Sequence, residues 1–434
     1  MFGTAPALPD AESMVCIFLI LLVPLAVAGL ALLNTGFVRS RSAAHAMLST
    51  LCAVAVAAGA YFACGFAIGG YAGGSMHAIS IAGKEWNWLA GEKLFFRGLA
   101  LDVSPASLAA LLQLFGVGLA AAIPLGSVVD RWRLGASAAA AALLGGCVYP
   151  LFAHWSWGGG WLAQLGANYS LGRGFLDCGG AGSIQAVGGL NALAMLWILG
   201  PRRGKYSVEG MPMALPGHNT ILVLFGCLLA LPGWVGLNSA GAILFAGAGC
   251  ARVPLIAVNT MLSASASALT CLLITRIRFG KPDASLVANG WFGGLVASCA
   301  GCAFLTPLAA SLIGVVAGAL VTFSIQWLEL ISVDDTSGAF PVHGLCGLWS
   351  LLAAGVFARV PGAPAGQWLA QVVGAATLLG FVLPLSYGLN LLLDRVLPQR
   401  VPPEGERQGM DLHELGAGAY PEFVTYTEDS TRQW

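Results

Sequence analysis

Charge is the property that this sequence has least of. Only 9% of its 434 residues are Asp, Glu, Lys or Arg, whereas soluble domains carry about 25%. The 20 basic and 20 acidic residues balance, so composition gives no indication of a surface for nucleic acid. With 57% hydrophobic residues and a mean hydropathy of +0.80, the chain is predicted to be an all-α, polytopic membrane protein that lies in the lipid bilayer.

Motifs for catalysis and for metal binding are also missing. The sequence contains no phosphate-binding Walker loop, no H-E-x-x-H and no serine triad. Its 11 cysteines are scattered through apolar segments, so they are interpreted as small buried hydrophobes rather than a disulfide framework. Cys299 and Cys302 form a C-x-x-C, but no second pair follows at zinc spacing. We therefore expect no enzyme, no metal site and no cofactor.

Apolar segments of about 20 residues, the length of a helical membrane span, recur along the chain. We predict eleven, at 13–37, 44–70, 105–128, 134–156, 180–200, 217–238, 251–274, 285–301, 305–327, 338–357 and 367–394. Basic residues cluster after the odd-numbered segments, as at Arg39, Arg131 and Arg276. Because basic loops stay in the cytoplasm, the N-terminus is predicted outside and the C-terminus inside.

A motif shared by the two halves of the chain suggests where a site lies. Residues 177–190 and 335–348 both read D-x7-[Q/H]-x3-G-L, with Gln185 in the first copy and His343 in the second. The copies open the fifth and tenth segments, which run in opposite directions. The chain is thus predicted to hold an inverted five-helix repeat plus a final helix. Polar side chains inside a membrane usually serve function, so Gln185 and His343 are predicted to meet near the middle.

Polar and aromatic residues near the membrane surface leave several interpretations open. Trp157 precedes three glycines, and an exposed indole face there would bind a cation by its quadrupole, worth about 0.5–2 kcal/mol. Asp177 either caps the following helix or attracts a cation. Gln113, Asn238 and Asn259 are interpreted as hydrogen-bonding partners between helices.

The chain divides into a transmembrane domain, 1–395, and a polar tail, 396–434, predicted to be cytoplasmic. The tail contains Pro402-Pro403 and several acidic residues, and it has no apolar stretch with which to build its own core.

Several stretches, taken in order, are similar to one known family. They are L-N-T-G-F-V-R-S-R-S-A-A-H at 33–45, W-G-G-G at 157–160, G-W-V-G-L-N at 233–238, the motif at 335–347 and G-M-D-L-H-E-L-G-A-G-A-Y at 409–420. Over essentially its whole length the sequence resembles the ammonium transporter (Amt/Mep/Rh) family. The resemblance implies a homotrimer in the cell membrane with one pore per subunit, and a tail that PII-type regulatory proteins often bind.

The resemblance also implies roles for single residues. Trp157 is the tryptophan of the outer vestibule, and Asp177 is the structural aspartate near it. His343 is the second histidine of the pore's pair, and the first aligns with Gln185, a departure from the family pattern. Glutamine cannot accept and return a proton as imidazole does.

The outer gate departs from the family pattern as well. The first of its two stacked phenylalanines aligns near Gly116, with Phe115 as the candidate to substitute, and the second aligns with Leu237. The vestibule serine falls near Ser239 or Gly241, and Trp234 of the motif at 233–238 is placed with the pore.

Transport of ammonium or ammonia is the function that the resemblance implies. NH4+ is recruited at the outer vestibule, loses its proton and crosses a narrow hydrophobic pore. A dry pore rejects Na+ and K+, which cannot shed their charge. The alternative is an ammonium sensor of the same fold with little or no transport. Sensors in the family carry fused signalling domains, and none follows in this sequence, which favours transport.

Overall fold

The computed structural model describes residues 8–71 and 75–420. Within them, ten helical segments are long and apolar enough to cross a membrane, and α11 (Ala284–Ala297) is a shorter apolar helix. The uninterrupted crossing helices are α1 (Asp10–Phe37), α4 (Pro105–Val128), α9 (Thr220–Ala246), α10 (Val253–Phe279) and α12 (Pro307–Leu330).

The other five crossing segments each contain a π-helical turn. The second runs through α2 (Ala43–Ala60), η2 (Tyr61–Gly65) and α3 (Phe66–Gly69), and the fourth through α5 (Leu134–Leu143), η4 (Leu144–Val148) and α6 (Tyr149–Ser156). The fifth joins η5 (Ala181–Ala186) to α8 (Val187–Leu199), and the ninth joins η7 (Phe340–Leu345) to α13 (Cys346–Phe357). The last comprises α14 (Gln367–Thr377), η8 (Leu378–Val382) and α15 (Leu383–Val396).

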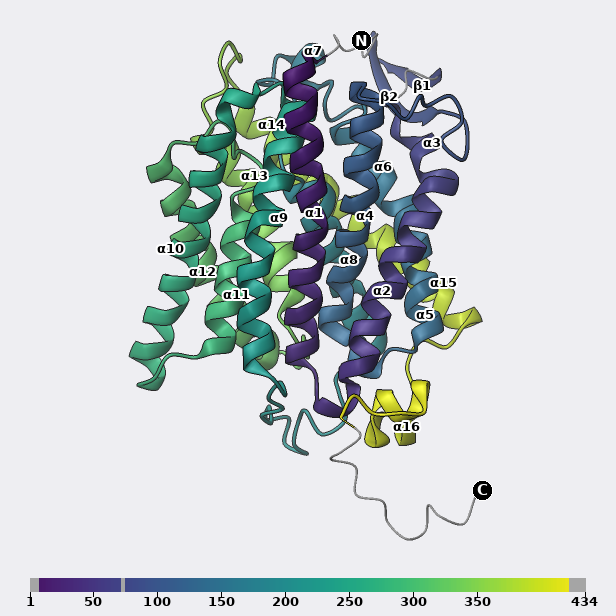
Figure 1. Ribbon diagram of the computed structural model, residues 1–434, viewed down its shortest axis with the longest axis vertical. Coiled ribbons are helices and arrows are strands. Elements are labelled where there is room, and N and C mark those ends of the chain that lie inside the picture. Colours follow the sequence, from purple (N-terminus) through teal and green to yellow (C-terminus); the bar gives the residue numbers. More distant parts are fainter. Residues whose placement is uncertain (1–7, 72–74, 421–434) are drawn as a thin grey trace.

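The eleven predicted segments are confirmed as apolar helices, although several of their ends differ from the prediction. Helix α9 continues to Ala246 rather than ending at 238, and α11 is shorter than the predicted segment. In Figure 1 the start of α1 and helix α16 (Pro403–Gln408) lie at opposite ends of the bundle. Which end faces the cytoplasm stays a prediction.

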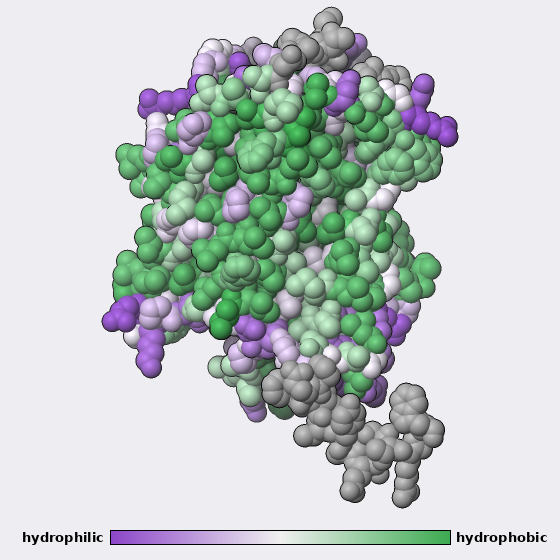
Figure 2. Space-filling model, in the orientation of Figure 1, coloured by the Kyte–Doolittle hydropathy of each residue, from purple (hydrophilic) through white to green (hydrophobic). Residues whose placement is uncertain are grey.

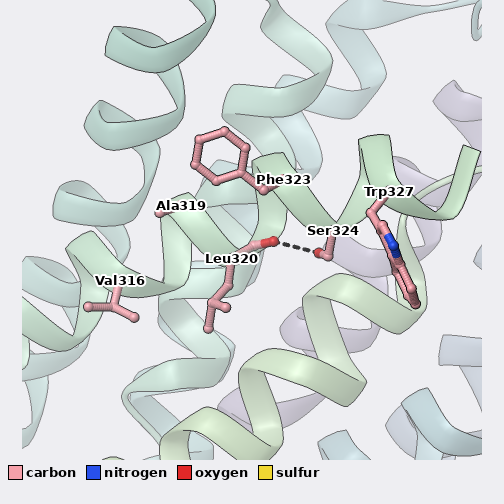
Figure 3. Close-up of a pocket in the computed structure, with 6 residues that line it drawn as sticks. All are labelled: Val316, Ala319, Leu320, Phe323, Ser324 and Trp327. Carbon is pink, nitrogen blue, oxygen red and sulfur yellow. Dashed lines mark hydrogen bonds between the residues drawn. The ribbon is translucent and has the colours of Figure 1, made fainter. Parts of the chain in front are cut away.

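The outer surface of the bundle matches a membrane environment. Figure 2 shows a broad apolar belt around the middle and hydrophilic residues gathered at the two ends. One shallow apolar groove runs along α12, lined by Val316, Ala319, Leu320, Phe323, Ser324 and Trp327 (Figure 3). The Ser324 hydroxyl donates to the Leu320 carbonyl, and the lining is otherwise mostly apolar, so the groove suits apolar contact with lipid or protein.

A β-hairpin that the sequence analysis did not predict follows α3. Strands β1 (Ser75–Ile81) and β2 (Lys84–Gly91) pair antiparallel across Ala82-Gly83, both of which have positive φ. That is the geometry of the tight turn best matched to strand twist. Trp86 of β2 stacks on Trp161 at 5.3 Å between ring centroids, which anchors the hairpin beside the end of α6.

The described part of the tail packs against the transmembrane domain. Asp411 of η9 (Asp411–Leu415) is buried, and its carboxylate accepts hydrogen bonds from the backbone of Ala44 and His45 at the start of α2. In α16, buried Glu406 pairs with Arg400 at 2.9 Å and with Arg203 at 3.7 Å. Up to residue 420, the tail is therefore folded onto the end of the bundle where α1 and α2 meet.

Candidate functional site

Each copy of the repeated motif begins with an aspartate that caps a π-helical turn. Asp177 accepts hydrogen bonds from the backbone N–H groups of Gly182 and Ser183 at 3.1 and 2.8 Å. Asp335 accepts from those of Ala339 and Phe340 at 3.0 and 2.9 Å. Both carboxylates thus satisfy free N–H groups at a helix start. The capping interpretation of Asp177 has direct geometric support, and attraction of a cation stays a prediction.

Glycines of the motif let the two copies cross in close contact. A Cβ on Gly189 would lie 2.1 Å from the Gly344 nitrogen, and one on Gly347 would lie 2.7 Å from the Ala181 carbonyl oxygen. No side chain larger than hydrogen fits at such distances without moving the backbone. Small residues at helix crossings are typical of membrane bundles, and here they bring η5 and η7 together.

Gln185 and His343 meet at this crossing. Gln185 Oε1 lies 2.7 Å from His343 Nδ1, and the two residues are 0% and 1% exposed. An amide oxygen can only accept, so Nδ1 carries the proton and donates, which leaves Nε2 as the unprotonated nitrogen of a neutral imidazole. The sequence analysis paired these residues from spacing alone, and the structure adds that histidine is the donor. No residue in the described part of the chain makes a hydrogen bond with the Gln185 Nε2 group.

Trp157 does not present the exposed indole face that its position before three glycines suggested. Its side chain is 5% exposed, and its Nε1–H donates to the Asp177 carbonyl at 2.7 Å. The ring of Phe245 stacks on the indole with centroids 4.5 Å apart and planes 11° from parallel. Phe245 lies in the last turn of α9, beyond the predicted end of that segment, so sequence analysis missed it.

The structure separates the other predicted vestibule residues. Phe115 is half-buried and makes no ring contact with Trp157, or with any other aromatic side chain in the described ranges. Ser239 is fully buried, and its hydroxyl has no hydrogen-bond partner within residues 8–71 and 75–420. A Cβ on Gly241 would meet the Cys178 carbonyl oxygen at 2.1 Å, so α9 packs tightly against the loop that contains Asp177.

The predicted pore residues on α9 lie in the buried core. Leu237 and Trp234 are both buried. Trp234 packs edge-on against Phe292 of α11 at 5.5 Å, and Phe292 packs edge-on against His343 at 6.4 Å. An aromatic wall therefore adjoins the imidazole. The Phe292 ring was not predicted, because nothing distinguishes it from the other apolar residues of its segment.

Two of the three amides interpreted as interhelical partners are confirmed in that role. Asn238 donates to Thr260 and Ser298 at 2.9 and 3.1 Å, and Asn259 donates to two backbone carbonyls at 2.9 and 3.0 Å. Gln113 is the exception. It is 1% exposed and lies beside the Tyr71 hydroxyl, but among the described residues neither its oxygen nor its nitrogen has a partner within hydrogen-bond geometry.

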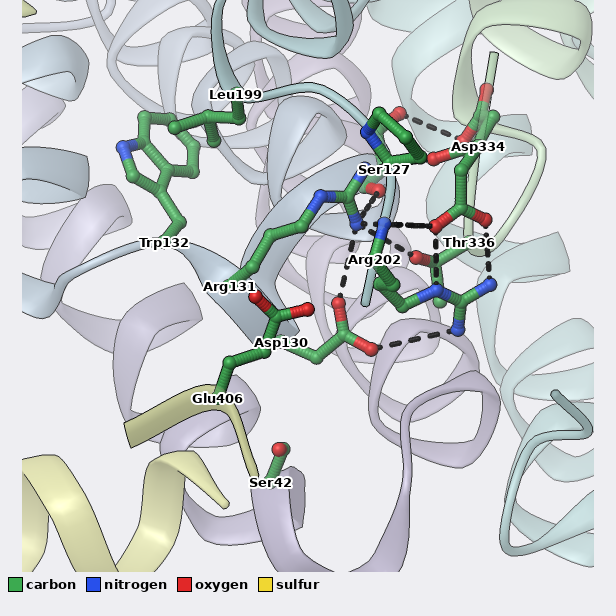
Figure 4. A network of polar contacts seen from close by, with 12 residues as sticks. Ser42, Ser127, Asp130, Arg131, Trp132, Leu199, Arg202, Asp334, Thr336 and Glu406 are labelled. Atoms are coloured by element: carbon green, nitrogen blue, oxygen red, sulfur yellow. Dashed lines mark hydrogen bonds and ion pairs between the residues drawn. The ribbon is translucent and has the colours of Figure 1, made fainter. Parts of the chain in front are cut away.

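A buried ion-pair network supports the start of η7 at the end of the bundle where α16 lies (Figure 4). Arg202 donates to both carboxylate oxygens of Asp334 at 2.7 Å. Arg131 donates to the Asp334 backbone carbonyl at 2.8 Å and pairs with Asp130 at 3.3 Å. The next residue, Asp335, caps η7, so the network holds the helix that carries His343.

The comparisons with known proteins agree with this architecture. A model of the Ammonium Transporter Family matches residues 13–420. This chain belongs to that family. It is therefore a multi-pass membrane protein of a transport family rather than an enzyme.

Named relatives match this transporter-family chain over most of its length. "Ammonium transporter Amt2" of Archaeoglobus fulgidus is 37% identical over 435 residues, covering 96% of this chain and 89% of the relative. "Ammonium transporter" of Bacillus subtilis is 30% identical, covering 94% and 98%.

Solved structures show the same arrangement of helices. A structure titled "Sensor Amt Protein" has a TM-score of 0.82 at 25% identity, covering 93% of this chain and 98% of that one. Candida albicans Mep2 has a TM-score of 0.79 at 24% identity, covering 96% and 93%; this second likeness concerns the fold alone.

Proposed function

We propose that this protein transports ammonium across the cell membrane, recruiting NH4+ beside Trp157 and conducting it, after loss of a proton, past Gln185 and His343. The observation that carries the proposal is the hydrogen bond between Gln185 and His343, which joins the two repeats at a fully buried point. A neutral imidazole with one unprotonated nitrogen can accept a proton or a hydrogen bond from a passing solute.

The surroundings of this pair favour a solute that can become neutral. Phe292 and Trp234 place aromatic surface beside the imidazole, and desolvating a permanent ion in such surroundings costs several kcal/mol or more. Ammonium avoids that cost by giving up its proton, whereas Na+ and K+ have none to give. The test is ammonium-evoked current and methylammonium uptake in proteoliposomes, with Na+ and K+ as comparison ions.

Gln185→His is expected to raise ammonium-dependent current. Gln185 supplies a hydrogen-bond acceptor to His343 but no second base that titrates near neutral pH. An imidazole pair would offer two such bases, so a proton would pass between them more readily. Gln185→Asn, which retains the amide but withdraws it from His343, is the matched control and should not raise the current. Native current as large as that of Gln185→His would contradict the relay idea, and water or His343 alone would then suffice.

An ammonium sensor of the same fold is the second candidate. Its support is the stacked Phe245 ring, which covers Trp157, together with the likeness to the structure titled "Sensor Amt Protein". If neither native protein nor Gln185→His carries an ammonium-evoked current while ammonium still binds, the sensor hypothesis replaces transport.

Phe245→Ala is expected to increase the affinity for ammonium. Removing the ring frees one face of Trp157, and a cation over an indole face gains about 0.5–2 kcal/mol, which predicts about a two- to thirtyfold lower KM for ammonium-evoked current. Phe245→Tyr keeps the stacked ring and should behave as native protein. A higher KM for Phe245→Ala would show instead that the Phe245 ring belongs to the cation site.

The proposed function includes assembly into a homotrimer and regulation through the tail. A homotrimer with a pore in each subunit, the N-terminus outside, and binding of a PII-type protein to the tail at 396–434 are inferred from family membership. The exposed apolar residues of α1, α9 and α10, such as Phe18, Phe225 and Leu273, are compatible with subunit or lipid contact. Native mass spectrometry in detergent tests the trimer directly.

A further inference from the structure

The C-x-x-C motif at Cys299 and Cys302 has a structural context that its sequence did not indicate. It follows α11, where the chain meets the stretch before η5. The backbone N–H of Cys178 donates to the Ala300 carbonyl at 3.0 Å, and that of Gly179 donates to the Cys299 carbonyl at 3.0 Å. These two hydrogen bonds join a loop of the first half of the chain to a loop of the second. The backbones of the two halves are therefore in direct contact here.

The two cysteines of the motif have different neighbours. The Cys299 thiol donates to the Leu295 carbonyl at 3.4 Å, and this residue belongs to the main hydrophobic core. Cys302 belongs with Cys178 to a second, smaller hydrophobic cluster, which also contains Phe304. The Cys302 thiol lies beside the Cys178 thiol. Both thiols are free and both residues are 0% exposed. One cysteine from each half therefore meets the other inside this second cluster.

The second cluster lies at the end of the bundle where α1 begins. Arg252, which precedes α10, donates to the Ala303 carbonyl at 2.8 Å. In the same short turn, η6 (Cys250–Arg252), the Cys250 N–H donates to the carboxylate of Glu12 in α1 at 3.3 Å. This end of the bundle is predicted to face outside. Disulfides form and persist outside the cytoplasm, whereas cytoplasmic thiols are kept reduced.

We propose that Cys178 and Cys302 are joined by a disulfide bond in the mature protein, which links the two inverted halves on their outer side. One cysteine thiolate attacks a disulfide-bearing oxidant, which forms a mixed disulfide and releases one thiol of the oxidant. The second cysteine thiolate attacks the protein sulfur of the mixed disulfide and releases the other thiol. Together the two cysteines give up two protons and two electrons, which convert the disulfide of the oxidant into two thiols.

The bond forms while the chain folds, because thiols buried in apolar surroundings are inert and both cysteines are fully covered in the folded protein. The same burial then protects the bond from reductants. Cys178 follows Asp177, whose carbonyl accepts from Trp157 and whose carboxylate caps η5. Covalent attachment of this loop to the second half therefore stiffens the start of the segment that carries Gln185.

Counting thiols tests the bond without any variant. Protein is purified from membranes without reductant, denatured in SDS in the presence of excess maleimide, and labelled before and after reduction. The chain has 11 cysteines, so we expect two fewer labels before reduction than after it. Proteolysis of the unreduced protein should yield a cross-linked pair of peptides that contain Cys178 and Cys302, identified by mass spectrometry.

Single substitutions identify the two partners. Cys178→Ser and Cys302→Ser should each take up the same number of labels before and after reduction. Cys299→Ser is the matched control from the same motif, and it should retain the difference of two labels. Full labelling of the native protein before reduction would overturn the proposal, and so would a cross-linked peptide pair from any other two cysteines. Cys178 and Cys302 would then have a packing role only.

Discussion

His343→Ala is expected to reduce ammonium uptake about a hundredfold or more, because a positioned group that exchanges a proton commonly contributes about 10²–10⁴ in rate. His343 is the only titratable member of the buried pair, and its partner Gln185 cannot take over proton exchange. Without the imidazole the path keeps its apolar walls but loses the base that receives the proton. Uptake of methylammonium into proteoliposomes measures the effect.

Two further variants separate proton exchange from packing. His343→Gln retains a side chain that can hydrogen bond with Gln185 but cannot titrate, and it should be as inactive as His343→Ala. His154→Gln alters a different buried histidine, whose Nδ1 lies 3.1 Å from the Gly69 carbonyl oxygen, and it should keep most of the uptake. Native uptake by a well-folded His343→Gln would leave His343 with a packing role only.

Asp334→Asn is expected to destabilise the folded protein by about 3–5 kcal/mol, the usual result when one partner of a buried ion pair is removed. Arg202 and Arg131 are both buried, and they would lose the carboxylate that they surround. Thermal unfolding in detergent measures the change. Glu404→Gln is the control, because the Glu404 side chain is exposed; it should change the free energy of unfolding by less than about 0.5 kcal/mol.

The stability of Asp334→Asn is compared with that of the native protein at a pH where the Asp334 carboxylate is charged. Burial alone would raise the pKa of Asp334, but hydrogen bonds and charge from Arg202 and Arg131 more than offset it, so the pKa lies below its ordinary value. A depressed carboxyl pKa stabilises the fold above the ordinary pKa, and that stability is lost as pH falls through the folded value. At neutral pH Asp334 is charged, and its full contribution to the free energy of unfolding is present. Equal unfolding temperatures for native protein and Asp334→Asn at pH 7 would contradict the assignment.

The same variant links the network to transport. Asp334 adjoins Asp335, whose carboxylate caps η7 and also accepts from the Ser127 hydroxyl at 2.8 Å. Asp334→Asn weakens the contacts with Arg202 and therefore disturbs the start of the helix that carries His343. Glu406 of α16 pairs with Arg400 and Arg203 near this network, which gives the tail a physical connection to the helix that carries His343.

The sequence by itself determined the membrane-spanning segments, because hydrocarbon requires a run of about 20 apolar residues in closed helical hydrogen bonding, and that is a local property. The sequence also predicted the repeat. The spacing from Asp177 to Gln185 equals that from Asp335 to His343, which places both polar residues at the same position of two inverted halves. The hairpin at 75–91 was missed, because its alternation of Ile79 and Ile81 with Trp86 and Trp88 around Ala82-Gly83 is short and lies within a long loop between two apolar segments.

Only the tertiary structure decided which side chains meet. In a helix that is apolar on every side, no polar stripe indicates which face turns inward, so nothing in the sequence placed Phe245 on Trp157 or Phe292 beside His343. The hydrogen bond between His343 and Gln185 can form because two helices from different halves approach closely, which their glycines permit. Gln113 looked like a partner between helices, but in the described part of the chain its amide only lies beside the Tyr71 hydroxyl, which follows α3, and no residue of another helix meets it in hydrogen-bond geometry.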